Sequence, residues 1–517
     1  MSLSRSSIDT LRLARVTRTG MNQGGSMTAA IALLAVGTRI VFAQTAAPNQ
    51  IESWVTNPDR SSMFQKSAEP IAFRANANAG GTAIVIDPTQ QMQTVDGFGF
   101  ALTGGSAELL MKMSREARAK VLRQVFARDG NNLGVSYLRV SIGASDLNSF
   151  VFSYDDLAPG ETDYDLKRFD LGQDRKDVIP VLKEILEIAP DIRILGSPWS
   201  APAWMKTNGA VKGGALKEEC YAAYALYLVK YVEAMKKEGI VIDAITIQNE
   251  PLNANNTPSM QWMLHQQLVF LREDLYPAFL KTGLKTKVLL FDHNTDRPDY
   301  PLALLSDPVV SQFAAGSAFH NYGGDMSAMS SVHMARPDKN IYFTEQMIIE
   351  RPGGGNLEIA ATVKRMIIDA MRNWSRNVLL WNLAADPQNR PHTDNGGCPM
   401  CQGAITIDRD MASLNLAYYT IAHASKFVRP GSVRIGSTNR GDQTVELTED
   451  EERPGVKRLA LIENTQVLPN VAFRTPEGKT VLVVANDTQS VNAFAIQYDG
   501  KLASVKLNPG SVGTYIW

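Results

Sequence analysis

The stretch EECYAAYALYLVKYVEAMKKEGIVIDAITIQNEP, residues 218–251, contains a helical pattern followed directly by a strand pattern. Its apolar residues return at steps of three and four, which predicts a helix over residues 218–238 with one buried face. They are Tyr221, Ala225, Leu228, Val232 and Met235. Gly239 suits the left-handed position that ends such a helix. The run from Ile245 to Glu250 then predicts a strand with a carboxylate at its end.

The same alternation of helical periods and short apolar runs continues on both sides of this stretch. Further predicted strands cover residues 134–141, 192–197, 287–292, 317–320, 341–345 and 377–382. Such alternation predicts a parallel sheet, and its extent over residues 96–431 favours a (β/α)8 TIM barrel over an open doubly wound sheet. No GxGxxG or P-loop opens a helix, which disfavours nucleotide binding.

The regions on either side of residues 96–431 lack the helical period. Residues 46–95 contain strand-like runs at 70–74 and 82–87, and residues 432–517 contain them at 459–462, 480–485 and 514–517. Turn residues separate these runs, which indicates β-structure in both regions. We therefore expect a catalytic barrel accompanied by a smaller all-β module.

The first 45 residues have the pattern of a secretory signal peptide. Four arginines precede the apolar run 27–36, and small residues at 41–43 provide a cleavage point. The run is too short for a membrane span, so we expect an exported protein without a transmembrane segment. The alternative is a disordered or anchoring N-terminus, and either Met1 or Met27 could be the true start.

The charge balance bears on the class of partner. Among 517 residues the formal net charge is −1, with both signs dispersed. This disfavours nucleic acid and anionic membrane surfaces and favours a neutral substrate. The six histidines are scattered rather than clustered at ligand spacing, so we predict neither a metal nor another cofactor.

Two of the three cysteines form a CxxC, Cys398 and Cys401. They lie in a Gly- and Pro-rich loop rather than at a helix start, which argues against a thioredoxin-like role. Zinc needs about four ligands, and only His392 is near in sequence. In an exported protein a structural disulfide is favoured. Cys220 is expected to be a buried helical residue.

Glu250 and Glu345 are the strongest candidates for catalysis. Each ends a strand-like run, and active sites of β/α barrels gather at the carboxyl ends of the strands. They are separated by about three βα units of ~30 residues, which places their strands across the barrel from each other. Such a pair suits cleavage of a glycosidic bond, with retention at about 5–5.5 Å and inversion at about 6.5–9.5 Å. The residues alone leave that distance open.

Other polar and aromatic residues also stand at predicted strand ends. They are Arg139, Asp146, Trp199, Trp204, Asn249, His320, Tyr322, Trp381 and Asn382. Asn249 could bind a sugar hydroxyl or form a turn, and Arg139 could orient a carboxylate or join a stabilising ion pair. The tryptophans could stack on a pyranose or pack in the core. His320 could hydrogen-bond a carboxylate or a sugar hydroxyl.

Taken in order, several motifs resemble glycoside hydrolase family 30. The matching stretches are 96–103, 137–146, 197–209, 248–251, 344–345, 381–384, 425–431 and 514–517. The resemblance implies a retaining mechanism with Glu250 as acid/base and Glu345 as nucleophile. It also implies that the strands before the barrel and the C-terminal tail form one β-sandwich side domain. Its implied substrate contacts are Arg139, Asp146, Trp199, Asn249, His320, Tyr322 and Trp381.

The expected partner is a carbohydrate or glycolipid. We expect a β-glycosidase of the glucosylceramidase type first, with an endo-β-1,6-glucanase and a non-catalytic carbohydrate-binding barrel as alternatives. A redox protein built on the CxxC is a further, weaker alternative. Asn321 stands where the lysosomal glucosylceramidase has a tryptophan, and residues 353–355 and the CxxC loop also differ from it, so the aglycone stays open. The sequence leaves the oligomeric state open.

Overall fold

The computed structural model describes residues 49–75, 82–350, 355–440, 443–450, 453–463 and 466–517. The chain divides into two units, Met1–Ala47 and Pro48–Trp517, and only the second contains described residues. The predicted signal peptide therefore lies outside them and stays a prediction. No helix within the described ranges has both the length and the hydropathy needed to cross a membrane.

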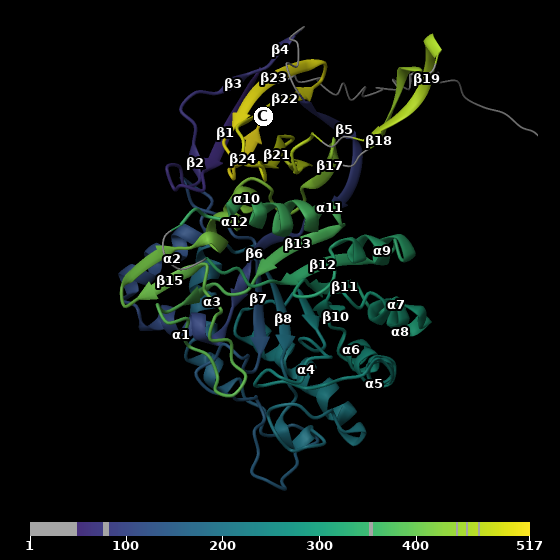
Figure 1. Ribbon diagram of the computed structural model, residues 1–517. Helices are drawn as coiled ribbons and strands as arrows, with labels where there is room; N and C mark the ends of the chain where they lie inside the picture. Colours follow the sequence, from purple (N-terminus) through teal and green to yellow (C-terminus); the bar gives the residue numbers. More distant parts are fainter. Residues whose placement is uncertain (1–48, 76–81, 351–354, 441–442, 451–452, 464–465) are drawn as a thin grey trace, which may run out of the picture. The chain divides into compact units, whose positions relative to one another are not determined.

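Eight parallel strands close into a barrel in chain order, which confirms the predicted TIM barrel (Figure 1). They are β6 (Gly97–Leu102), β7 (Tyr137–Ile142), β8 (Arg193–Pro198), β9 (Ala244–Thr246), β10 (Lys287–Asn294), β11 (Gly316–His320), β12 (Asn340–Glu345) and β13 (Ser375–Leu380). The last strand pairs with the first, β13 with β6. Their carboxyl ends therefore meet at one mouth, where a barrel carries its chemistry.

Helices cover the outside of the barrel (Figure 1). They are α1 (Gly104–Lys112), α2 (Arg115–Phe126), α3 (Val178–Ile188), α4 (Tyr221–Lys237), α5 (Leu264–Val269), α6 (Tyr276–Thr282), α7 (Asp299–Ser306), α8 (Pro308–Phe313), α9 (Ser327–Ala335), α10 (Ile359–Val363), α11 (Ala370–Arg372) and α12 (Leu416–Ser425). π-helical turns at Phe270–Leu275 and Lys364–Asp369 join α5 to α6 and α10 to α11. The helix predicted before Gly239 is confirmed as α4, and that glycine has a φ of 84°.

Two strands of the barrel differ from their prediction. β9 ends at Thr246, so Glu250 lies in the following loop rather than on the strand. There its φ is 48°, which a regular strand cannot accommodate. β6 was not identified as a strand from the sequence. At Gly99 a Cβ would lie 1.9 Å from the Tyr137 carbonyl oxygen, so the close approach of β6 to β7 requires glycine there.

The side domain is one 11-stranded sheet that draws on both ends of the described chain. Its strands are β1 (Gln50–Thr56), β2 (Gln65–Lys66), β3 (Ile71–Ala72), β4 (Arg74–Ala75), β5 (Thr82–Thr94), β17 (Val433–Ser437), β20 (Asn470–Arg474), β21 (Thr480–Ala485), β22 (Asn492–Tyr498), β23 (Lys501–Leu507) and β24 (Val512–Ile516). β1 pairs with β24, and β5 lies between β17 and β22. The prediction that strands before the barrel join the C-terminal tail is confirmed.

Two smaller sheets complete the secondary structure. β14 (Ala384–Ala385), β15 (Ile405–Asp408) and β16 (Met411–Leu414) form one of them, and it frames the loop that carries the CxxC. β18 (Gln443–Asp450) and β19 (Arg453–Glu463) form an antiparallel hairpin. The predicted disulfide between Cys398 and Cys401 is present, and Cys220 is free and buried in the turn before α4.

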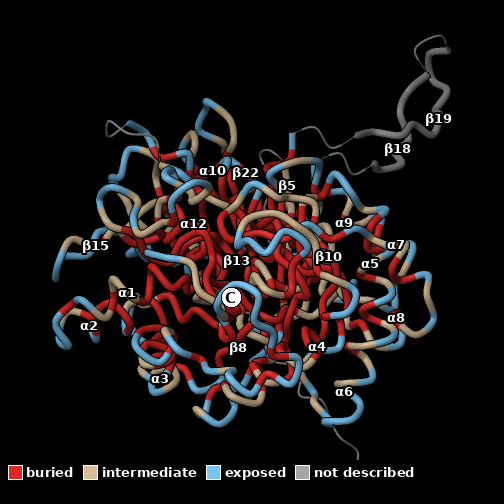
Figure 2. The backbone as a smooth tube through the Cα atoms, turned by 90° about the horizontal axis from the view of Figure 1, so that it is seen from below, coloured by how far each residue is buried: buried red, intermediate tan, exposed pale blue. Residues whose placement is uncertain are grey.

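A buried histidine links the barrel to the side domain. His423 on α12 contacts the Thr514 hydroxyl of β24 at 2.9 Å through Nδ1 and the Thr56 hydroxyl of β1 at 2.8 Å through Nε2. Trp54 and Phe64 from the N-terminal strands join the same apolar core as the barrel helices. Figure 2 shows this buried interior, in red, surrounded by exposed loops. The barrel and the side domain therefore share one packed core.

Candidate active site

The two candidate glutamates lie in one pocket at the carboxyl ends of the barrel strands. The cavity measures about 310 Å³, and both carboxylates are 6% exposed. One oxygen of Glu250, one oxygen of Glu345 and one ring nitrogen of His320 all lie within 4.8 Å of one another. A larger hollow of about 1030 Å³ lies at the amino ends of β9 and β10, away from this cluster. Chemistry that needs two carboxylates is therefore placed at the mouth.

Arg139 is the cation at the centre of the site, and it is completely buried on β7. Its Nη2 donates to Asp292 at 2.7 Å and to the Asn249 side-chain oxygen at 2.8 Å. Its Nη1 donates to Glu345, and its Nε donates to the Ser197 hydroxyl at 3.2 Å. One guanidinium thus fixes side chains from four different strand ends, as its rigid fork of donors allows.

Asp292 is the counter-ion of Arg139, and the sequence analysis did not single it out. It accepts hydrogen bonds from the hydroxyls of Thr246 at 2.8 Å and Thr344 at 2.6 Å. Burial alone would raise its pKa, but Arg139 and His320 outweigh burial and hold the pKa well below its usual range. The strand-end rule could have found it, because Asp292 directly follows the apolar run of β10.

His320 connects this ion pair to Glu250. Its Nε2 lies 3.0 Å from Asp292 and its Nδ1 lies 3.2 Å from Glu250. Burial would lower the pKa of His320, but the carboxylates of Glu345 and Asp292 outweigh it and raise the pKa to about 9. His320 therefore holds a positive charge beside the candidate acid.

That charge changes the proton distribution expected for the glutamates. Burial favours neutral Glu250, but the hydrogen bond and charge of His320 prevail and lower its pKa to about 2. Burial raises the pKa of Glu345, and the charges of His320 and Arg139 only partly offset the effect. The role of Glu250 as acid requires it to keep its proton longer than Glu345, and in the free site these pKa shifts run in the opposite direction. His320 holds the proton instead.

Glu345 also receives a hydroxyl donor from Tyr322. The Tyr322 Oη donates to Glu345 at 3.1 Å and accepts from the backbone N–H of Met347 at 3.0 Å. Asp146 lines the same pocket. Burial and the negative charges of Glu345 and Glu250 raise the pKa of Asp146 to about 8.

The tryptophans separate into two groups. Trp199 and Trp381 line the pocket and stack with ring centroids 5.3 Å apart, and the Arg139 guanidinium carbon lies 4.8 Å from the Trp199 centroid. Trp204 instead donates its Nε1 hydrogen to Asp155, and Asn382 accepts from Thr103 and Ser106. Neither Trp204 nor Asn382 lines the pocket, so the structure brings those two candidates less close to the glutamates than Trp199 and Trp381.

Several pocket residues were not singled out from the sequence. They are Asn253, Asn256, His293, Asn294 and Met347, and the predicted disulfide of Cys398 and Cys401 also lines the pocket. The Asn253 amide donates to Glu250 at 2.7 Å. His293 and Asn294 end β10, so the strand-end rule could have included them, whereas Asn253 and Asn256 lie several residues beyond the end of β9 and escape that rule.

Glu250, His320 and Glu345 also have the spacing of a metal-binding group among the described residues. His320 and Glu345 are, however, already bound to Asp292 and Arg139. The positive guanidinium and imidazolium disfavour a further cation. The prediction that no metal is used stays a prediction.

Comparisons with known proteins agree with this geometry. The Glycosyl hydrolase family 30 TIM-barrel domain matches residues 95–428, and the Glycosyl hydrolase family 30 beta sandwich domain matches residues 431–515. The Endo-1,6-beta-D-glucanase of Neurospora crassa is 32% identical, over 84% of this chain and 92% of its own. The Lysosomal acid glucosylceramidase of Mus musculus is 26% identical, over 86% of this chain and 85% of its own.

Solved structures include the endo-beta1,6-glucanase BT3312. It is 30% identical, with a TM-score of 0.77, and the match covers 90% of this chain and 99% of that one. Two family domains thus account for nearly all of the chain after residue 94. The chain belongs to glycosyl hydrolase family 30 and is an O-glycosyl hydrolase.

Proposed function

We propose that this enzyme hydrolyses β-1,6-glucosidic bonds in glucans, with retention of configuration, by double displacement. The observation that carries the mechanism is the spacing of Glu250 and Glu345, whose nearer oxygens lie within 4.8 Å. Retaining glycosidases hold their carboxyl groups about 5–5.5 Å apart, because no water has to fit between nucleophile and sugar. An inverting enzyme needs about 6.5–9.5 Å.

Glu345 acts as the nucleophile in this proposal. Arg139 and Tyr322 both donate to its carboxylate, which aligns it and stabilises its anionic form. The carboxylate attacks the anomeric carbon, and the bond to the leaving oxygen breaks. Glu345 loses its negative charge as the glycosyl ester forms, so the electrostatic support for the His320 cation weakens at that moment.

Glu250 and His320 deliver the proton together. As Glu345 is neutralised, the His320 proton moves across the 3.2 Å contact to Glu250, which protonates the leaving oxygen. In the second step Glu250 removes a proton from water, and the hydroxide attacks the anomeric carbon. The bond to Glu345 breaks, the sugar leaves with its β configuration, and the proton returns to the Glu250–His320 pair. Each proton released is thus recovered within one cycle.

The rim beside Glu250 favours a polyhydroxylated aglycone. Asn253, Asn256, His293 and Asn294 line this side of the pocket with amides and an imidazole. Asn321, where the lysosomal relative has tryptophan, donates to the Thr295 hydroxyl at 3.0 Å. Such a polar rim can hydrogen-bond the hydroxyls of a further sugar, which a lipid tail cannot offer.

The relatives support the same choice. The Neurospora crassa enzyme at 32% identity and the solved structure at 30% identity are both named as endo-1,6-glucanases. The glucosylceramidase of Mus musculus is less similar, at 26%. We therefore place glucan ahead of glucosylceramide, which reverses the order expected from the sequence. Endo action on the chain interior is part of the proposal.

Removing the two glutamates should have different effects. Glu250→Gln should lower kcat/KM on an alkyl β-glucoside by about 10²–10⁴-fold, because the leaving oxygen lacks its acid. It should still be labelled on Glu345 by a 2-deoxy-2-fluoroglucosyl fluoride, since fluoride leaves without a proton. Glu345→Gln should not be labelled, and mass spectrometry of the digested protein gives the readout.

Glu187→Gln, on the exposed part of α3, is the matched control and should behave as the wild type. The roles are wrong if the label is found on another residue. They are also wrong if Glu250→Gln hydrolyses the alkyl glucoside at the wild-type rate.

Removing His320 should shift the alkaline limb of the pH profile of kcat/KM to lower pH. A raised pKa means that the His320–Glu250 pair keeps its proton up to about pH 9 and loses it, with activity, above that. In His320→Asn the proton must stay on a carboxyl alone, so the limb should fall by at least about one pH unit. His333→Asn, a histidine on α9 outside the pocket, should not move the limb. If the alkaline limb of the pH profile does not move in His320→Asn, His320 does not supply the proton to Glu250.

A substrate panel tests the choice of aglycone. Hydrolysis of β-1,6-gluco-oligosaccharides should exceed that of glucosylceramide in detergent micelles by at least about 10²-fold in kcat/KM, because the polar rim can bind the hydroxyls of a glucan and not a lipid tail. Oligomers linked β-1,3 and β-1,4 control for linkage. Asn256→Leu should reduce this difference in kcat/KM between the two substrates by weakening glucan binding.

A polymeric β-1,6-glucan should yield a mixture of oligosaccharides. Release of glucose alone would contradict endo action, and equal or faster hydrolysis of glucosylceramide would contradict the glucan assignment.

A further inference from the structure

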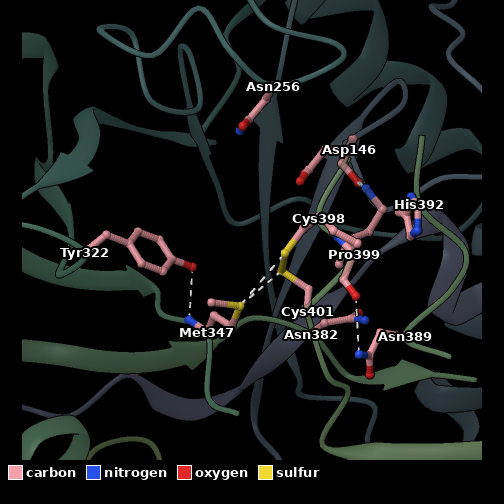
Figure 3. The surroundings of a disulfide bond; sticks show 12 residues. Asp146, Asn256, Tyr322, Met347, Asn382, Asn389, His392, Cys398, Pro399 and Cys401 are labelled. Atoms are coloured by element: carbon pink, nitrogen blue, oxygen red, sulfur yellow. Dashed lines mark hydrogen bonds between the residues drawn. A yellow bond between two sulfur atoms is a disulfide. The ribbon is translucent and has the colours of Figure 1, made fainter. Parts of the chain in front are cut away.

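The Cys398–Cys401 disulfide lies in the wall of the catalytic pocket. Both cysteines line the cavity that contains Glu250 and Glu345. Cys401 is buried and Cys398 is half-buried, whereas Pro399 and Met400 between them are exposed. Figure 3 shows the two sulfurs directed toward Met347, with Asp146 on a neighbouring wall. The tip of the turn therefore faces solvent while the sulfurs face the sugar site.

The sulfurs contact a methionine that adjoins the nucleophile. The Met347 Sδ lies 3.3 Å from Cys401 Sγ and 3.9 Å from Cys398 Sγ. The backbone N–H of the same methionine donates to the Tyr322 hydroxyl, which in turn donates to Glu345. Both sulfurs and Met347 also pack with Trp199 and Trp381. The disulfide thus supports the aromatic wall and the residue that orients Tyr322.

The loop that carries the disulfide has other anchors. The Thr393 N–H donates to the Asp146 carbonyl at 2.9 Å. The Asn395 carbonyl accepts from the Thr257 hydroxyl at 2.6 Å and from Lys212 at 2.8 Å. Asn389 donates to the Pro399 carbonyl at 3.3 Å, as drawn in Figure 3. These bonds hold the loop on two sides independently of the disulfide.

We propose that the Cys398–Cys401 disulfide is a specificity-determining wall of the pocket that binds the sugar undergoing hydrolysis. This rests on the proposed function, because it assumes that a glucosyl unit occupies the pocket. Disulfide and thioether sulfurs are weak hydrogen-bond acceptors and polarisable packing surfaces. They suit carbon-bound hydrogens of a pyranose, so the hydroxyls turn toward Asp146. The wall selects one orientation of the ring by excluding the others.

Breaking the bond changes the shape of this wall. A phosphine reductant attacks one sulfur, the S–S bond breaks, and hydrolysis of the phosphonium gives two thiols and a phosphine oxide. Two unbonded sulfurs separate to about 3.5–4 Å, the contact distance of heavy atoms. In this pocket the separation displaces Met347 and intrudes on the sugar. Reduction should therefore weaken binding of the sugar more than it slows the chemical step.

Binding of 1-deoxynojirimycin, a glucose-shaped iminosugar, measured by titration calorimetry is the direct test. Reduction of the wild type by tris(carboxyethyl)phosphine should raise the Kd about tenfold, the effect of one mismatched contact in a tight pocket. It should raise KM for an aryl β-glucoside by the same factor, with kcat within about threefold. Reoxidation with oxidised glutathione should restore both. The double variant Cys398→Ser/Cys401→Ser should have the Kd and KM of the reduced enzyme, and the reductant should not change them.

Cys220→Ser is the matched control, because its buried thiol is outside the pocket, and it should respond to reduction as the wild type does. The wall is refuted if the reduced wild type, with both thiols titrated and its circular dichroism unchanged, keeps its Kd and KM. If reduction lowers only the melting temperature, the disulfide stabilises the fold and does not shape the sugar site. If the double variant does not fold, the Kd of the reduced wild type is the test. If the disulfide resists reduction, the Kd of the double variant is the test.

The outcome is separable from the proposed function. Suppose that reduction weakens iminosugar binding but the enzyme does not hydrolyse β-1,6-glucan. The proposed role of the disulfide would then be supported, and the proposed substrate would be contradicted. If the enzyme hydrolyses the glucan and its Kd for the iminosugar does not change on reduction, the proposed substrate would be supported and the proposed role of the disulfide would be contradicted.

Discussion

The structure depends on the ion pair between Arg139 and Asp292, which is completely buried at the centre of the barrel mouth. Burying two charges costs several kcal/mol per ion unless further hydrogen bonds satisfy both groups. Here Asn249, Glu345 and Ser197 accept from the guanidinium, and Thr246, Thr344 and His320 bind the carboxylate. These same bonds orient both glutamates. The network that makes the charges tolerable is therefore also the one that sets the geometry of catalysis.

The backbone is shaped to present this network. Glu250, Phe291 and Asp292 have φ values of 48°, 75° and 58°, a region that residues other than glycine rarely adopt. The pairing of β10 with β11 shifts register between Phe291 and His293, and such bulges re-aim side chains near active sites. Strained positions persist only where the surroundings over-determine them. The closed barrel, and its link through His423 to the side domain, provide those surroundings.

Much of this architecture could be predicted from the sequence, because apolar periodicity and strand-end polarity are local signals. They placed Glu250 and Glu345 three strands apart, and they placed Arg139 and His320 at the mouth. They failed where tertiary structure overrides the pattern. Asp292 ends the predicted strand 287–292, so the strand-end rule could have included it, but its pairing with the buried Arg139 and the register shift beside it are not visible in the sequence. The apolar run before Glu250 likewise gave no sign that β9 ends at Thr246. The proton on His320 depends on three carboxylates that meet only in the folded chain.

The proposed mechanism requires Glu345 to form a covalent bond to the anomeric carbon while Glu250 protonates the oxygen that leaves the same carbon. The stereochemistry of the first product tests this most directly. Hydrolysis of a β-glucoside followed by proton NMR should show the β-anomer first, with the α-anomer growing only through mutarotation. Initial release of the α-anomer would mean that water attacks directly, and it would contradict the role of Glu345 as nucleophile.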